Sequence, residues 1–220
     1  MATQYHVIAS GSLQCNAVVL WDDRSHQAIV IDPTDDARPV LAWLERHHVR
    51  VETILLTHAH FDHAADAERA MTTLGKKAKL HTLDHGLYHR IPEQAEIFGS
   101  KISARHLPID TLADGDEFTL GPSTTIRVLH TPGHTEGSVA FYVPTGPWVI
   151  SGDTLFCGSI GRTDLPGGSF QALRESIVNK LYRLPDETIV VPGHGPTTTI
   201  GHEKRQNAFI RADQASTDWL

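Results

Sequence analysis

The stretch that most constrains this chain is a group of three histidines and an aspartate that follows a short apolar run. Residues 53–56 are too few for a free-standing helix and are typical of a buried strand. The motif His58-x-His60-x-Asp62-His63 follows one residue later. Alternate side chains share a face in an extended segment, so we expect His58 and His60 to point the same way. Nitrogen donors combined with a carboxylate suit zinc, iron or manganese.

Histidine is common in this chain, with 15 in 220 residues, so a scattered histidine carries little information. Three histidines and an aspartate in this fixed order arise far less often by chance. A solvated loop is the simpler alternative. The order and spacing of the donors nevertheless favour a metal site.

The composition is that of an ordinary globular protein and excludes several classes of function. Hydrophobic residues make up 40% of the chain and charged residues 20%. The net charge of −7, without a basic run, argues against nucleic-acid binding. Two cysteines imply no disulfide framework, no apolar run reaches membrane-spanning length, and the first residues do not resemble a signal peptide. We therefore predict a single domain, residues 1–220, in a reducing cytoplasm, with neither nucleic-acid nor membrane partners.

Short β-rich runs alternate with helical stripes along the chain. The predicted strands are residues 5–8, 16–21, 28–31, 53–56, 78–81, 118–120, 125–129, 138–143, 148–150 and 188–191; the predicted helices are residues 39–48, 64–74 and 167–184. Residues 138–143 and 148–150 should form a hairpin, and residues 112–116 a turn. Residues 84–100 contain Pro92 and Gly99 and predict broken helices, which either pack on the core or form a lid.

Three further strands each end at a metal-ligand type of residue. His134 lies in a Pro-Gly turn after residues 125–129, Asp153 follows residues 148–150, and His194 follows residues 188–191. Together with the first motif they give seven donors. A single tetrahedral zinc with three protein ligands does not need so many, but two sets of three with a shared carboxylate do. Two ions about 3.5–4 Å apart can act on one substrate.

These motifs resemble the metallo-β-lactamase superfamily over nearly the whole chain. The resemblance implies an α/β fold, the four-layer αββα sandwich, with two mixed β-sheets face to face and helices outside. It also implies two divalent metal ions, zinc in first place and iron or manganese as alternatives. The implied ligands are His58, His60 and His134 for the first ion, Asp62, His63 and His194 for the second, and Asp153 between them.

Within that superfamily, residues 151–156, 161–164 and 192–196 resemble the glyoxalase II group. The closest resemblance is to short bacterial hydroxyacylglutathione hydrolases, which lack the C-terminal helical domain of longer enzymes. Arg162 matches a basic position near the thiol substrate of that group and is the implied substrate-binding residue. Asp164 stands where the group has a tyrosine.

The resemblance implies hydrolysis of a thioester such as S-D-lactoylglutathione by a metal-bound hydroxide. Asp62 is the implied catalytic residue, because it can orient the nucleophile as well as bind metal. The expected partner is a small, glutathione-derived thioester, and no oligomeric state is predicted. Alternatives are an iron-dependent persulfide dioxygenase of the same fold and a non-catalytic metal-binding module. A nuclease is disfavoured by the acidic charge, and a β-lactamase by the apparent lack of an export signal.

Four features outside the seven donors have competing interpretations. Asp32 ends a predicted strand and is either a turn residue or the partner that orients a ligand histidine. His130 lies inside a predicted strand and is expected to be structural. Cys157 is expected to be a small packed residue rather than a soft ligand. The glycines before residue 169 are expected to help start a helix rather than bind phosphate.

Overall fold

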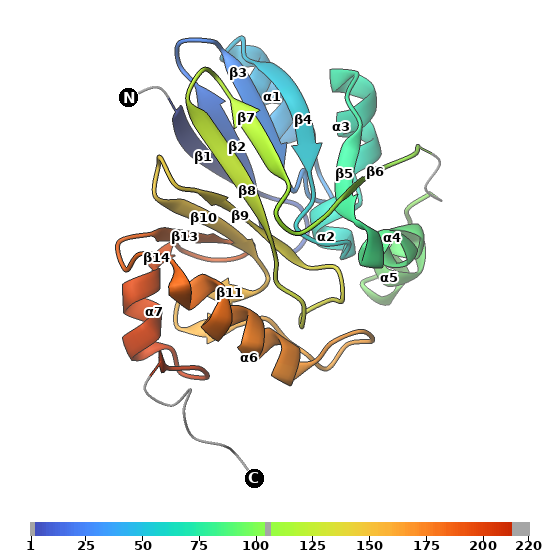
Figure 1. Cartoon of the computed structure of the whole chain (residues 1–220). Coiled ribbons are helices and arrows are strands. Elements are labelled where there is room, and N and C mark those ends of the chain that lie inside the picture. Colours follow the sequence, from blue (N-terminus) through green and yellow to red (C-terminus); the bar gives the residue numbers. More distant parts are fainter. Residues whose placement is uncertain (1–2, 104–106, 213–220) are drawn as a thin grey trace.

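Two mixed sheets lie face to face between outer helices (Figure 1). The computed structural model describes residues 3–103 and 107–212, and within these ranges each large sheet has six strands. The first sheet comprises, in spatial order, β1 (Thr3–Ser10), β2 (Cys15–Asp22), β3 (Gln27–Ile31), β4 (Arg50–Leu55), β5 (Ala78–His81) and β6 (Asp110–Leu112). β1 to β3 pair antiparallel, whereas β3 to β6 pair parallel.

The second sheet is built mainly from the C-terminal half of the chain. Its strands, in spatial order, are β14 (Thr198–Thr199), β13 (Ile189–Pro192), β10 (Trp148–Gly152), β9 (Val139–Val143), β8 (Thr124–His130) and β7 (Glu117–Leu120). β9 and β10 form the predicted antiparallel hairpin, and β10 pairs parallel with β13. A short separate ribbon consists of β11 (Leu155–Phe156) and β12 (Ser159–Ile160).

Helices cover the outer faces of both sheets. They are α1 (Arg38–Arg46), α2 (Phe61–Ala64), α3 (Ala67–Leu74), α4 (His85–His89), α5 (Ile91–Ile97), α6 (Phe170–Asn179) and α7 (Ile200–Gln206), with 3-10 turns η1 (Thr82–Asp84) and η2 (Leu181–Arg183). In Figure 1, α1 and α3 lie beside the first sheet, while α6 and α7 lie beside the second. No helix among the described residues is long and apolar enough to cross a membrane.

The side-chain alternation of β2 explains the layering. Val18 and Leu20 belong to the apolar cluster between the two sheets, whereas Val19 belongs to the cluster shared with the outer helices. A strand that is buried on both faces is apolar at consecutive positions, as here. A third cluster joins the second sheet to α6 and α7. Three apolar layers therefore separate four structural layers, and the predicted αββα fold is confirmed.

Several predicted elements differ in detail from the structure. The helix expected over residues 64–74 is interrupted, because Asp66 accepts a hydrogen bond from Ala37 N at 3.0 Å and donates its own backbone N–H to Thr34 O. The helix expected to reach residue 184 ends at Asn179 and continues as η2. Leu112, expected in a turn, ends the short strand β6, and α7 was not predicted.

Residues 84–100 form the predicted broken helices, and they pack on the loop of the first motif. Gln94 of α5 accepts a hydrogen bond from Phe61 N at 3.1 Å and donates to Ala59 O at 3.1 Å. Tyr88 is fully buried, whereas Phe98 is 54% exposed and stacks on Phe61 at 4.7 Å. These contacts support the packing interpretation of the segment.

Candidate metal centre

The candidate site lies at one edge of the sandwich, where strands of both sheets end. β4 precedes the loop with four clustered donors, while β8, β10 and β13 of the other sheet precede the loops with one donor each. Two backbone hydrogen bonds join the sheets at this edge. Val139 N donates to Thr57 O at 2.8 Å, and Asn16 N donates to Gly193 O at 2.7 Å. Residues far apart in the sequence are thereby held in one place.

Three histidines form one tight group, which we call the imidazole set: His58, His60 and His134. His60 Nδ1 lies 3.1 Å from His58 Nε2 and 2.8 Å from His134 Nε2. His58 is fully buried and His134 is 3% exposed. The three nitrogens therefore face one point from three sides.

A carboxylate and two imidazoles form a second group, the mixed set: Asp62, His63 and His194. Asp62 Oδ2 lies 3.1 Å from His194 Nε2 and 3.7 Å from His63 Nε2. The two imidazole nitrogens are 3.3 Å apart. Gly193 precedes His194, and a Cβ at this glycine would overlap Asp153 Oδ1, so only glycine allows the backbone to approach this closely.

Asp153 lies between the two sets. Its Oδ1 is 3.3 Å from His63 Nε2, and its Oδ2 is 3.5 Å from His134 Nε2 and 3.7 Å from His194 Nε2. Within the described residues, Oδ1 is buried without a hydrogen-bond partner. A buried carboxylate oxygen without a hydrogen-bond partner is costly unless a cation occupies the space that it faces.

Hydrogen bonds at Nδ1 of two ligand-type histidines, on the side of each ring that faces away from the centre, determine which ring nitrogen is available to a metal. Nδ1 of His134 faces Arg162 O at 2.8 Å, and Nδ1 of His194 faces Leu13 O at 3.2 Å. A carbonyl can only accept, so in each neutral ring Nδ1 carries the proton and Nε2 has the lone pair. That lone pair points into the centre, as a metal ligand requires.

Asp32 holds histidines of both sets through one carboxylate. Its Oδ2 accepts from His63 Nδ1 at 2.9 Å and from Thr57 Oγ1 at 2.6 Å, and its Oδ1 accepts from Thr57 N at 2.7 Å. The Thr57 hydroxyl lies 3.0 Å from His58 Nδ1, so its oxygen can accept the His58 proton. Of the two interpretations left open by the sequence, the structure supports a residue that orients histidines.

A second buried carboxylate, Asp84, was not predicted as part of the site. It accepts hydrogen bonds from Ala59 N at 3.0 Å, from Thr135 Oγ1 at 2.8 Å and from Gly137 N at 2.8 Å. Burial raises the pKa of Asp84, and these hydrogen bonds only partly offset that rise. Asp84 therefore ties the loop of His60 to the loop that carries the third histidine of the imidazole set.

The two sets differ in how strongly their imidazoles hold protons. Burial, reinforced by neighbouring imidazoles, holds the pKa of His58 well below 6.5 and lowers that of His60 to about 3. Burial alone would lower the pKa of His63 too, but the carboxylates of Asp153 and Asp62 raise it well above 6.5. The pKa of His194 is also raised, because its hydrogen bond with Asp62 and the charge of Asp153 outweigh burial.

The donor geometry suits two divalent ions. Zinc–nitrogen bonds of about 2.0–2.1 Å in a tetrahedron place the donors roughly 3.3–3.4 Å apart. The five donor separations given above for the two sets, 2.8–3.7 Å, bracket this value. Asp153 contacts donors of both sets, as a bridging ligand would. The structure thus brings all seven predicted donors together, and their assignment as ligands stays a prediction.

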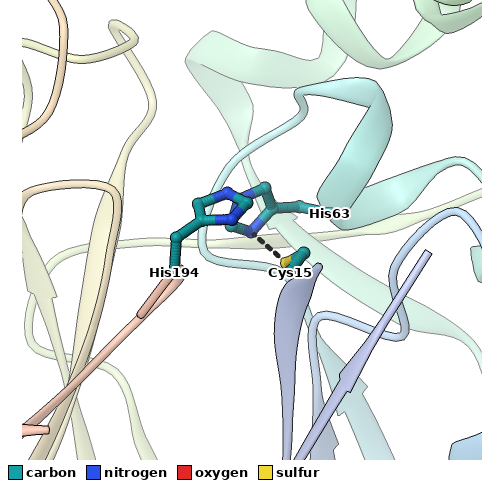
Figure 2. A group of neighbouring side chains, drawn as sticks. All are labelled: Cys15, His63 and His194. Carbon is teal, nitrogen blue, oxygen red and sulfur yellow. Dashed lines mark hydrogen bonds between the residues drawn. The ribbon is translucent and has the colours of Figure 1, made fainter. Parts of the chain in front are cut away.

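Cys15 lies against His63 but faces away from the centre. Figure 2 shows its thiol beside the His63 ring, where Sγ is 3.4 Å from Nδ1. The same Nδ1 is bonded to Asp32, so His63 cannot offer it to a metal without losing that partner. Burial raises the pKa of Cys15 to about 12, which keeps the thiol protonated. Cys15 therefore packs behind the histidine rather than completing a third ligand set.

The remaining predicted residues lie at the rim or outside the centre. Arg162 is exposed, and its guanidinium donates to both carboxylate oxygens of Asp164 at 2.8 Å. The prediction that Cys157 is packed was wrong, because it lies exposed between β11 and β12. His130 has the expected structural role, stacking on His81 at 4.1 Å with Nε2 beside Glu136 O.

Comparison with known proteins agrees with this geometry. The sequence profile of the metallo-beta-lactamase superfamily matches residues 10–194. The chain is 35% identical over 207 residues to hydroxyacylglutathione hydrolase GloC of Haemophilus influenzae, covering 94% of this chain and 97% of that protein. The structure of BLEG-1 B3 metallo-beta-lactamase superposes with a TM-score of 0.87 at 39% identity, covering 94% of this chain and 99% of that one. The structure of TTHA1623 in a di-iron-bound form superposes with a TM-score of 0.85 at 41% identity, covering 93% of this chain and 100% of that one.

The chain therefore belongs to the metallo-beta-lactamase superfamily. This fold binds divalent metals, and the cluster of histidines and aspartates lies where the strands of both sheets end.

Proposed function

We propose that this chain is a binuclear metallohydrolase that cleaves thioesters, with S-D-lactoylglutathione as the reference substrate. The observation that carries the proposal is the division of seven donors into two sets that Asp153 joins. The similarity to a hydroxyacylglutathione hydrolase over 94% of the chain supports the thioester assignment. The similarity to a di-iron protein keeps iron beside zinc as the metal.

Each side chain of the centre has a defined part in this proposal. The imidazole set would hold one ion and the mixed set would hold the other. Asp153 would contact both ions. Bound there, divalent ions would lower the pKa of a bound water and would polarise the acyl carbonyl. Asp32 keeps His63 in the tautomer that offers Nε2, and Arg162 O does the same for His134.

Asp62 has a further task besides binding metal. Burial would raise its pKa, but His63 and His194 lower it, so the carboxylate is ionised at neutral pH. An ionised carboxylate can accept a hydrogen bond from the attacking water and hold it in line with the acyl carbon. The departing group is a thiolate, a good leaving group, so the chain needs no dedicated general acid.

The direct test is steady-state hydrolysis of S-D-lactoylglutathione by zinc-loaded protein, with an iron-loaded sample alongside. We expect kcat/KM of about 10⁴ M⁻¹s⁻¹ or more, the lower end of the usual enzyme range. Negligible hydrolysis of this and other thioesters by protein that holds two ions would overturn the proposal.

β-Lactam hydrolysis is a second candidate, because a structural relative at 39% identity is a B3 metallo-beta-lactamase. The same preparation should be assayed with a chromogenic cephalosporin and, after iron loading, for oxygen uptake with glutathione persulfide. Turnover of either substrate without thioester hydrolysis would replace our proposal with a lactamase or a persulfide dioxygenase. Bound metal without any turnover would favour a non-catalytic metal-binding module.

The proposed location is a reducing cytoplasm. Both cysteines, Cys15 and Cys157, are free thiols in the structure. Fractionation of the source cells with an antibody against this chain tests the location, and recovery outside the cytoplasm would overturn it.

A further inference from the structure

The rim of the centre offers little positive charge to an incoming substrate. Five described loops surround the donors: residues 10–14, 57–63, 131–138, 153–168 and 193–197. Histidines apart, they contain one basic residue, Arg162, and four acidic ones. Two of the acids, Asp62 and Asp153, belong to the donor sets, which leaves Glu136 and Asp164 at the rim.

Arg162, the one basic residue of these described loops apart from histidines, is already paired. Nε and Nη2 of Arg162 donate to Oδ1 and Oδ2 of Asp164, each at 2.8 Å, in a two-pronged pair. Arg162 is also fixed beside the centre, since its carbonyl accepts from His134 Nδ1. Because Asp164 is only two residues away, it competes with any substrate carboxylate for the same face of the guanidinium. The arginine stands near the centre with its charge neutralised.

The rim beside His194, here called the Leu13 side, carries two apolar side chains. Leu13, whose carbonyl accepts from His194, has a side chain that is 43% exposed. The Phe156 ring lies 6.3 Å from the His194 ring. A substrate arm that lies against Leu13 and Phe156 contacts hydrocarbon, so charge on the arm would lose hydration there without gaining a partner from these two side chains.

We propose that Asp164 is a specificity-determining residue that neutralises Arg162 and adapts the site to thioesters whose thiol part carries no carboxylate. This inference rests on the proposed thioester hydrolysis and specifies its substrate class. The acyl group reaches the metal sets in the same way whatever the thiol. The thiol part lies along the rim, where the Arg162–Asp164 pair and the Leu13 side decide what is accepted.

The experiment compares two thioesters with the same D-lactoyl group: that of glutathione, which is anionic, and that of N-acetylcysteamine, which is neutral. For the zinc-loaded wild type we expect kcat/KM on the neutral thioester to equal or exceed that on the glutathione thioester. Asp164→Asn should raise kcat/KM for the glutathione thioester about two- to fivefold, the range that exposed ion pairs contribute. The gain should shrink in high salt, and the neutral thioester should change less than about twofold.

Two further variants distinguish the effect of the Arg162–Asp164 ion pair from the effect of negative charge at the rim in general. Glu136→Gln removes a rim acid without freeing Arg162 and should give no selective gain for glutathione. Adding Arg162→Met to Asp164→Asn should abolish the gain. A wild-type preference for the glutathione thioester of tenfold or more, or no selective gain in Asp164→Asn, would overturn the inference. Failure of both thioesters to react with metal bound would instead overturn the proposed function.

Discussion

The two donor sets lie side by side but are built differently. The imidazole set has no carboxylate of its own, so burial keeps the pKa of His58 and His60 low and both rings neutral. The mixed set contains Asp62, and the nearby carboxylates raise the pKa of His63 and His194. His58 and His60 are therefore free of competing protons at neutral pH, whereas His63 and His194 must release protons to bind metal.

The largest effect should come from removing the residue that the two sets share. Asp153→Ala should reduce bound metal and lower kcat/KM by more than about 100-fold. Mutation of a residue that only hydrogen-bonds a metal ligand already lowers metal affinity or activity about 10–100-fold. Metal analysis of the purified variant, together with turnover, measures both losses. Glu175→Gln on α6 is the control and should behave as wild type. Full metal content with full turnover in Asp153→Ala would contradict the bridging assignment.

The next effect tests a residue that supports both sets from behind. Asp32→Asn should weaken zinc binding about 10–100-fold, because His63 and the Thr57 hydroxyl beside His58 lose their common acceptor. Competition with a zinc-binding dye measures the affinity. The half-buried Asp36, which pairs with the exposed Arg38, supplies the control Asp36→Asn. An unchanged affinity in Asp32→Asn would show that the histidines are oriented by other contacts.

A smaller effect should be confined to the imidazole set. Asp84→Asn replaces one acceptor oxygen by a donor amide, which leaves at least one of the N–H or O–H groups of Ala59, Thr135 and Gly137 unpaired. We expect the free energy of unfolding of the metal-free protein to fall by about 1–3 kcal/mol. Urea unfolding followed by circular dichroism measures the change.

A second variant changes the other partner of the Asp84–Gly137 contact. A Cβ at Gly137 would lie 2.6 Å from Asp84 Oδ1, so Gly137→Ala should reproduce the loss. In both variants zinc should bind the imidazole set less tightly, while the mixed set is little changed. Equal weakening of both sets would mean that Asp84 supports the fold in general rather than one pair of loops.

The smallest effect is the pH dependence that distinguishes the sets. The pKa values of His63 and His194 lie above 6.5, so both rings still hold protons at that pH. The zinc affinity of the mixed set should therefore rise as the pH increases above 6.5 and these protons are lost. The pKa of His60 is about 3 and that of His58 lies well below 6.5, so both rings are neutral above pH 6.5 and give the imidazole set no such rise. Cobalt spectra recorded during titration at several pH values can follow the two sets separately. If the zinc affinities of both sets changed with pH in the same way, the proposed difference between the sets would be contradicted.

Local sequence was enough to predict the cluster of residues 58–63, because its donors are adjacent in the chain. The other three donors were recognisable as strand ends, but the αββα arrangement that brings them together came from the family resemblance. Asp84 was missed because its partners lie 25, 51 and 53 residues away and nothing local marks it. Asp32 was left open for the same reason, since its acceptor role depends on a loop 25 residues away.

Burial and helix continuity were the least predictable features. Cys157 follows a strand of apolar character, yet it lies in the tip of the β11–β12 ribbon and is exposed. The alanine-rich stretch after His63 predicts one helix, but Asp66 is held by tertiary contacts with Thr34 and Ala37. In both cases a contact with a distant part of the chain overrides the local preference.

The central claim is that the seven donors hold two ions with Asp153 between them. Anomalous diffraction from crystals grown with zinc tests this most directly. The account predicts two peaks about 3.5–4 Å apart, one beside His58, His60 and His134 and the other beside Asp62, His63 and His194. A single peak, or two peaks of which Asp153 contacts only one, would contradict it.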